Sequence, residues 1–113
     1  MAQKIYADIQ HIKEAINEVG TTDQSVIDTL EQAAKRASAQ IESEFVFLVS
    51  DEVPFDDPVP EFLEELANQL TEAYFWELQN GNKDLVETAL LRIKEQRDRR
   101  FNQVPSIIRG NPV

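Results

Sequence analysis

The sequence has no cysteine, one histidine and three glycines, and it contains no long apolar run. Without cysteine, the chain can form no disulfide, no thiolate zinc site and no cysteine nucleophile. A membrane helix would need about 18 consecutive apolar residues, and the first residues show no signal-peptide apolar core. These absences predict a soluble protein that is made in the cytoplasm and has no contact with a membrane.

Residues suited to catalysis are also scarce. His11 has Asp8 three residues before it, but a metal site in a helical bundle needs several ligands, often in repeated Glu-x-x-His pairs. His11 is therefore predicted to lie on the surface. The serines fall in no nucleophile motif, and the glycines are too far apart to form a phosphate-binding loop. The sequence predicts no catalytic residue, no cofactor and no metal.

Positive charge is rare and sits at one end of the chain. The 113 residues carry a net charge of −10. Residues 1–91 hold five basic and 19 acidic side chains, whereas residues 92–113 hold six basic and two acidic ones. An acidic body repels the phosphate backbone of nucleic acids. The opposite sign at the end favours head-to-tail packing or docking on an acidic partner, although the charge could also serve solubility alone.

Four segments have the apolar period of helices, which predicts an all-α bundle of about four helices. They are predicted at about 5–19, 24–45, 60–78 and 83–101. Thr22 or Asp23 can cap the second segment, Gly20 can end the first, and Asn82 can cap the fourth. The stripes comprise Ile5, Ile9, Ile12, Ile16 and Val19; Val26, Leu30, Ala33, Ala37, Ile41 and Phe45; Phe62, Leu63, Leu66, Leu70, Ala73, Tyr74 and Leu78; and Val86, Ala89, Leu90 and Ile93.

The connections between these segments differ in character. Residues 45–49 could finish the second helix or form a short extended piece. Three prolines within residues 50–60 predict a loop, and Pro60 suits an early helical position. After Ile93 the fourth segment becomes charged, so its second half is predicted to project as a solvated helix. We expect a helical domain over residues 1–101 and an extended C-terminal tail over residues 102–113.

Two groups of residues are candidates for contacts with other proteins. Phe75 and Trp76 fall partly off the apolar stripe of the third segment, so they serve either the core or an interface between subunits. Arg97, Arg99 and Arg100 lie among Glu95 and Asp98, which favours salt bridges or a protein contact over phosphate binding. The tail offers Val104, Ile107, Ile108 and Arg109 as a segment that docks on a partner.

The order of these features resembles the head–tail adaptors (head completion or connector proteins) of tailed bacteriophages. A short first helix opens with IYADI at residues 5–9, and a longer alanine-rich helix follows at residues 30–45, LEQAAKRASAQIESEF. The proline loop VPFDDPVP spans residues 53–60, and the apolar helix FLEELANQLTEAYFW spans residues 62–76. The resemblance covers most of the chain. It departs in the last quarter, where the fourth helix is longer and more charged.

The resemblance implies a structural protein of the virion neck. Family members form a ring, usually twelve-fold, between the portal protein and a downstream neck or tail protein, and DNA passes through the ring without specific binding. The chain would be a homo-oligomer in the virion and could be monomeric alone. A ring needs a heterologous interface, which the acidic body and the basic segment 92–109 could supply.

Three other functions fit parts of the sequence. The chain could be a free-standing acidic helical module that binds a basic partner, or another phage component such as a tail-completion protein. An enzyme with a metal site in the bundle would have to use His11. The first alternative predicts no ring, and the second differs from an adaptor only in its neighbours.

Overall fold

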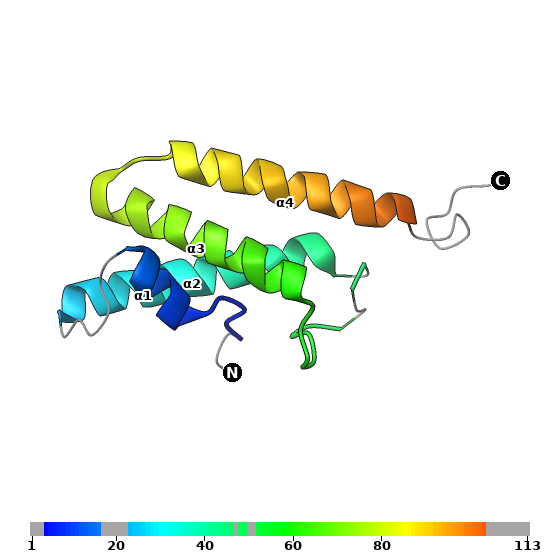
Figure 1. Cartoon of the computed structure of the whole chain (residues 1–113), viewed down its shortest axis with the longest axis horizontal. Helices are drawn as coiled ribbons and strands as arrows, with labels where there is room; N and C mark the ends of the chain where they lie inside the picture. Colours follow the sequence, from blue (N-terminus) through cyan, green and yellow to red (C-terminus); the bar gives the residue numbers. More distant parts are fainter. Residues whose placement is uncertain (1–3, 17–22, 47, 50–51, 104–113) are drawn as a thin grey trace.

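Over the residues that the structure describes, the protein is an all-α bundle of four helices, as the sequence predicts. The computed structural model describes residues 4–16, 23–46, 48–49 and 52–103. The helices are α1 (Ile9–Ala15), α2 (Gln24–Phe45), α3 (Glu61–Asn80) and α4 (Asp84–Gln103). The three long helices run antiparallel in chain order, and the short α1 lies beside them (Figure 1). The molecule is elongated, with extents of 55, 30 and 21 Å.

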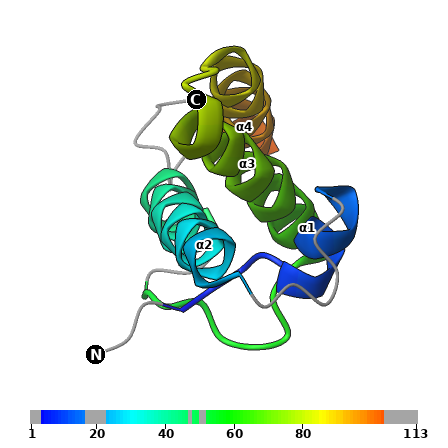
Figure 2. The same cartoon turned by 90° about the vertical axis from the view of Figure 1, so that its left-hand side faces the viewer.

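Helix α3 is the central element of the bundle. It contacts α1, α2 and α4, and it lies between α2 and α4 when the bundle is viewed along its length (Figure 2). Its buried residues extend around more than half of the helix, which reflects contacts with several neighbours; they are Leu63, Leu66, Ala67, Leu70, Thr71, Ala73, Tyr74 and Phe75. Leu78 was predicted to continue this stripe, but it is 45% exposed, so the buried part of the stripe ends before it.

The first helix begins four residues later than the sequence predicts. Asp8 caps α1, and its carboxylate accepts a hydrogen bond from the His11 N–H at 3.3 Å. The preceding residues bond to other helices instead: the Tyr6 N–H donates to Ser38 Oγ at 3.0 Å, and the Asp8 N–H donates to Asn68 Oδ1 at 2.7 Å. These tertiary hydrogen bonds satisfy the backbone without a helix. The predicted end at Gly20 lies outside the described residues.

Helix α2 begins and ends at local signals. Asp23 caps it and accepts a hydrogen bond from the Ser25 N–H at 3.0 Å, so the predicted aspartate cap is confirmed. The helix ends at Phe45, because Val46 has an extended ψ of 139°. The N–H groups of Leu48 and Val49 both donate to the Phe45 carbonyl, at 3.1 Å. Phe45 therefore completes the helix, and the apolar residues after it turn away.

The hairpin between α3 and α4 follows from its sequence. Gly81 adopts φ 76°, a left-handed conformation that glycine tolerates best, and its N–H donates to the Glu77 carbonyl at 2.8 Å. The Asn82 side chain accepts a hydrogen bond from the Asp84 N–H at 2.9 Å, as predicted for a cap. The helix α4 buries Val86 and Ile93 and continues through Gln103. The domain boundary predicted at residue 101 thus falls inside a helix.

The proline loop is anchored to the core by Phe55, which is 1% exposed. The Tyr6 hydroxyl accepts a hydrogen bond from the Phe55 N–H at 2.8 Å and donates to Glu42 Oε2 at 2.7 Å. Lys4 donates to the Phe55 carbonyl and forms an ion pair with Asp57 at 3.2 Å. The segment before α1, the helix α2 and the loop are therefore joined through Tyr6.

Thr71 is a buried polar side chain that we expect to cost stability. It is fully buried in α3, and its hydroxyl has no hydrogen-bond partner among the described residues. Thr71→Val should raise the free energy of unfolding by about 1 kcal/mol. On folding, the threonine hydroxyl loses its hydrogen bonds to water and gains none in return, whereas valine has no hydroxyl to desolvate. Urea denaturation would measure the change. Thr88→Val is the control, since Thr88 is exposed and already donates to the Asp84 carbonyl at 3.1 Å; a loss of stability in Thr71→Val would contradict the argument.

Candidate docking surface

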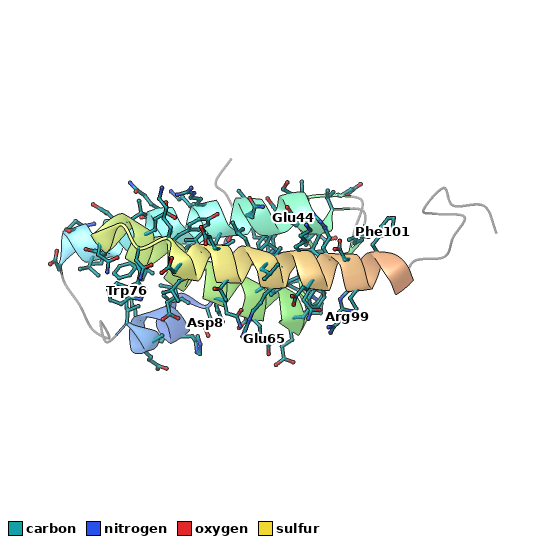
Figure 3. All side chains as sticks on the ribbon, turned by 90° about the horizontal axis from the view of Figure 1, so that it is seen from above. Asp8, Glu44, Glu65, Trp76, Arg99 and Phe101 are labelled. Carbon is teal, nitrogen blue, oxygen red and sulfur yellow. The ribbon has the colours of Figure 1, made fainter. Side chains whose placement is uncertain are left out.

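One stripe of the central helix is not covered by its neighbours. Glu65, Gln69, Glu72 and Trp76 are spaced four, three and four residues apart, so they share one side of α3. Glu65 and Gln69 are exposed, and Glu72 and Trp76 are half-buried. Seen from above, the labelled residues Asp8, Glu65, Trp76 and Arg99 all lie on the same side of α4 (Figure 3). We call this surface, between α1 and α4 with α3 as its floor, the α1–α4 face.

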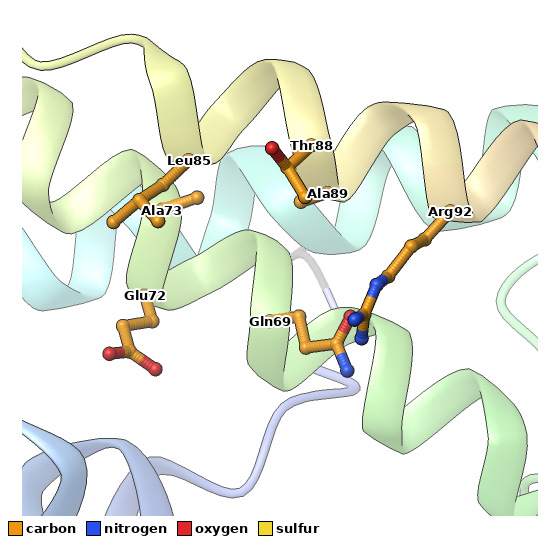
Figure 4. A pocket seen from close by; sticks show the side chains of 7 residues that line it. All are labelled: Gln69, Glu72, Ala73, Leu85, Thr88, Ala89 and Arg92. Atoms are coloured by element: carbon orange, nitrogen blue, oxygen red, sulfur yellow. The ribbon is translucent and has the colours of Figure 1, made fainter.

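A groove between α3 and α4 forms one part of the α1–α4 face (Figure 4). It has a volume of about 230 Å³ and is lined by Gln69, Glu72, Ala73, Leu85, Thr88, Ala89 and Arg92. The small side chains of Ala73 and Ala89 leave room where the two helices meet. Leu85 is 45% exposed at the rim. The groove thus combines an apolar base and rim with polar groups that could orient a partner.

The polar side chains of this groove are arranged asymmetrically. In Figure 4, Gln69 and Arg92 point toward one another across the groove, whereas the carboxylate of Glu72 points away from α4. A partner that lies in the groove would therefore meet a cation and an amide on one side and a carboxylate on the other. This pattern provides orientation as well as contact area.

A second hollow adjoins the groove through Gln69. It has a volume of about 390 Å³ and is lined by Asp8, His11, Glu64, Glu65, Asn68 and Gln69. Three of these residues are carboxylates, so the α1–α4 face is acidic beside α1 and carries Arg92 beside α4. A protein surface that contains both an apolar side chain and basic groups would complement it.

The two aromatic candidates for an interface have different environments. Phe75 is 3% exposed and belongs to the core, so the prediction that it could reach a subunit interface is wrong. Phe75 packs in the core of the bundle although it lies partly off the apolar stripe, so the helical period alone did not predict its burial. Trp76 is half-buried, and its ring lies edge-to-face on Phe75 with centroids 5.1 Å apart. Trp76 remains available at the α1–α4 face.

Two of the three predicted arginines are used within the chain. Arg97 pairs with Glu44 of α2 and with Asp98 at 3.3 Å. Partial burial lowers the pKa of the Arg97 guanidinium, but its hydrogen bonds to Glu44 and Asp98 outweigh this effect and leave the pKa raised. The Arg100 guanidinium stacks over the Phe62 ring, 3.8 Å from its centroid.

Arg97 and Arg100 therefore hold much of the second half of α4 against α2 and α3, which corrects the prediction that this whole half projects; only the end of α4 extends beyond the other helices (Figure 1). Arg99 is exposed and lies on the same side as Glu65 and Trp76 (Figure 3). Of the three arginines, Arg99 is the one placed on the α1–α4 face. The tail residues Val104, Ile107, Ile108 and Arg109 lie outside the described residues.

His11 is exposed, as predicted, and its backbone is tied to Asp8. Within residues 4–16, 23–46, 48–49 and 52–103, no three histidine or acidic side chains gather in a way that could hold a metal ion. In the same part of the chain, no helix is both long and apolar enough to span a membrane.

Sequence reasoning missed two features of this surface. Leu85 and Arg92 lie outside the apolar stripe of α4 that packs on α3. Their part in the groove depends on how α4 packs beside Ala73 of α3, which the sequence alone does not show. The sequence did contain one signal for this surface, because Leu85 is apolar and yet lies outside the predicted stripe of its helix. The role of Tyr6 was also missed, since its partners Glu42 and Phe55 are 36 and 49 residues away.

Comparisons of the chain with models of protein families, with curated proteins and with solved structures found no match.

Proposed function

We propose that the chain is a structural head–tail adaptor of a tailed bacteriophage, located in the virion neck between the portal and the next neck or tail protein. The observation that carries the proposal is the order of elements. A short capped helix, an alanine-rich helix, an anchored proline loop, a central apolar helix and a charged last helix follow one another, as the resemblance implies. The proposed role is assembly, without catalysis or a cofactor.

The α1–α4 face supports the assembly role. It is hollowed, it presents the half-buried Trp76 and the exposed Leu85, and it mixes carboxylates with Arg92. Large aromatic and apolar side chains within a polar rim are typical of protein interfaces. In a ring, this face would meet a different face of the neighbouring copy, which is the heterologous contact that a closed ring requires.

The charge of the body supports passage of DNA without binding. Residues 1–91 carry 19 acidic and five basic side chains. A channel lined with carboxylates repels the phosphate backbone, so the genome could slide through it. Within α4, Arg97 adds little attraction for phosphate, because it is already paired with Glu44 and Asp98.

A free-standing acidic module that binds a basic protein is the second candidate. The observation that favours it is the acidic hollow formed by Asp8, Glu64 and Glu65, which needs no ring to bind a basic segment. A tail-completion protein would use the same surfaces with different neighbours.

Native mass spectrometry across a wide concentration range, with negative-stain images of any oligomer, tests the proposal. A closed ring of about a dozen copies, as the resemblance implies, would support the adaptor and exclude the free-standing module. A monomer or dimer at every concentration would favour the module unless the protein assembles on a portal ring. Binding to purified portal rings would then decide between the two.

Removal of residues 104–113 is expected to abolish docking on the portal, because Val104, Ile107, Ile108 and Arg109 are proposed to dock there or on a neighbouring subunit. The cut follows Gln103, where α4 ends, so all four helices are retained. Portal binding by co-sedimentation would measure the effect, with circular dichroism as the control for folding. Unchanged binding by the shortened chain would refute the docking role of the tail.

A further inference from the structure

A second apolar groove lies at the far side of α4 from the α1–α4 face. It is lined by Val46 and Leu48 after the end of α2, and by Arg97, Asp98 and Phe101 of α4, with a volume of about 420 Å³. Figure 3 shows Glu44 and Phe101 on one side of α4 and Trp76 on the other. Val46 and Leu48 are only half-buried, and Phe101 is 45% exposed. We call it the α2–α4 groove.

The charged residues of this groove are fixed in place. Arg97 is held by Glu44 from α2 and by Asp98 from its own helix, which joins the two walls. The Asp98 side chain is nevertheless 58% exposed, so its carboxylate can meet a further cation. The groove therefore offers apolar contacts from three residues and one accessible negative charge.

The chain itself carries a segment with the matching chemistry. Ten residues follow Gln103, and among them Val104, Ile107 and Ile108 are apolar and Arg109 is basic. We propose that this tail occupies the α2–α4 groove of its own chain, with Ile107 and Ile108 against Leu48 and Phe101, and with Arg109 near Asp98. This inference goes beyond the proposed function and does not depend on it.

The tail is long enough to reach the groove. Arg97 lies six residues before Gln103, which is about 9 Å along a helix at 1.5 Å per residue. Four extended residues from Gln103 to Ile107 span up to about 13 Å. Pro105 has no N–H and disfavours a helical conformation in the residue before it, so the chain can leave the helix axis at that point.

Docking within one chain requires little intrinsic affinity. A short tether gives an effective concentration on the order of millimolar, so a weak contact is already occupied. Such a contact would cover two apolar surfaces, the groove and the tail, in the free protein. It would also leave the tail available to a partner that binds it more tightly, because a weak contact is easily displaced.

Methyl NMR on the full-length chain tests the proposal. The double variant Ile107→Asp with Ile108→Asp should shift the Val46 and Leu48 methyl signals, while those of Leu85 and Val86, outside the groove, should stay in place. Asn111→Asp is the matched control, because it adds one charge and keeps both isoleucines. We expect the wild-type signals to be the same at all protein concentrations, as an intramolecular contact requires.

Two results would overturn the inference. Unchanged Val46 and Leu48 signals in the double variant would show that the tail does not lie in the groove. Signals that move when the wild-type protein is diluted would show that the groove holds the tail of a second copy instead. The first result would leave ring assembly and portal binding untouched, and the second would instead support docking of the tail on a neighbouring subunit, so failure here would be distinguishable from failure of the adaptor function.

Discussion

Tyr6→Phe is expected to lower the free energy of unfolding by about 1–3 kcal/mol, although it removes a single oxygen atom. The hydroxyl satisfies the Phe55 N–H at 2.8 Å in a buried position and donates to Glu42 at 2.7 Å. Without it, the Phe55 N–H would lose its partner while remaining desolvated. Urea denaturation would measure the loss of stability, and hydrogen exchange at the Phe55 amide would show whether the proline loop opens.

Tyr74→Phe is the control for this substitution. Tyr74 is also buried, at 5% exposed, and its ring lies under the Arg36 guanidinium at 4.3 Å, a contact that phenylalanine would keep. We expect a smaller loss from Tyr74→Phe than from Tyr6→Phe. Equal losses would mean that the bridge from Tyr6 to Phe55 and Glu42 has no special role in stability.

The same bridge predicts a dependence on alkaline pH. Burial, together with the hydrogen bond to Glu42, raises the pKa of Tyr6 above its ordinary value of 10.0. The folded state therefore favours the neutral phenol, and its contribution to stability is complete below about pH 10 and is lost as the pH rises further. Above that pH, the wild type should lose stability more steeply than Tyr6→Phe. Tyr74, whose pKa burial also raises, is present in both proteins and cancels in the comparison.

Leu85→Asp is expected to weaken assembly at least about tenfold, which corresponds to about 1.4 kcal/mol. Leu85 is 45% exposed at the rim of the groove between α3 and α4, so a carboxylate there should be tolerated by the fold. In an interface, however, the new carboxylate would be desolvated close to the carboxylate of Glu72, which lines the same groove. Native mass spectrometry or portal binding would measure the loss.

Leu91→Asp provides the matched control, because Leu91 is 57% exposed on the same helix but does not line the groove. It should assemble as the wild type does. The single tryptophan, Trp76, gives a second readout, since burial of its half-exposed ring on assembly should shift its fluorescence to shorter wavelength. If both aspartate variants assemble normally and the fluorescence does not change, the α1–α4 face is not the interface.

The sequence by itself determined the number of helices and several of their limits. The apolar periods of α2, α3 and α4 predicted most of their buried residues, and Asp23 and Asn82 marked helix starts that the structure confirms. These features are local: a cap or a helix period depends on residues within one or two turns. The charge distribution, which supports the proposed function, can likewise be counted directly from the sequence.

The tertiary structure decided which side chains serve the fold and which remain for a partner. Arg97 and Arg100 looked equivalent to Arg99 in the sequence, but Glu44 and Phe62 engage the first two. The residues before α1 have a helical apolar pattern and yet are not helical, because Ser38 and Asn68 supply hydrogen bonds to their backbone. These partners are 30 to 60 residues away in the chain, and their positions depend on how the helices pack. Local sequence patterns do not encode that packing, which is why the docking surface became visible only in the folded protein.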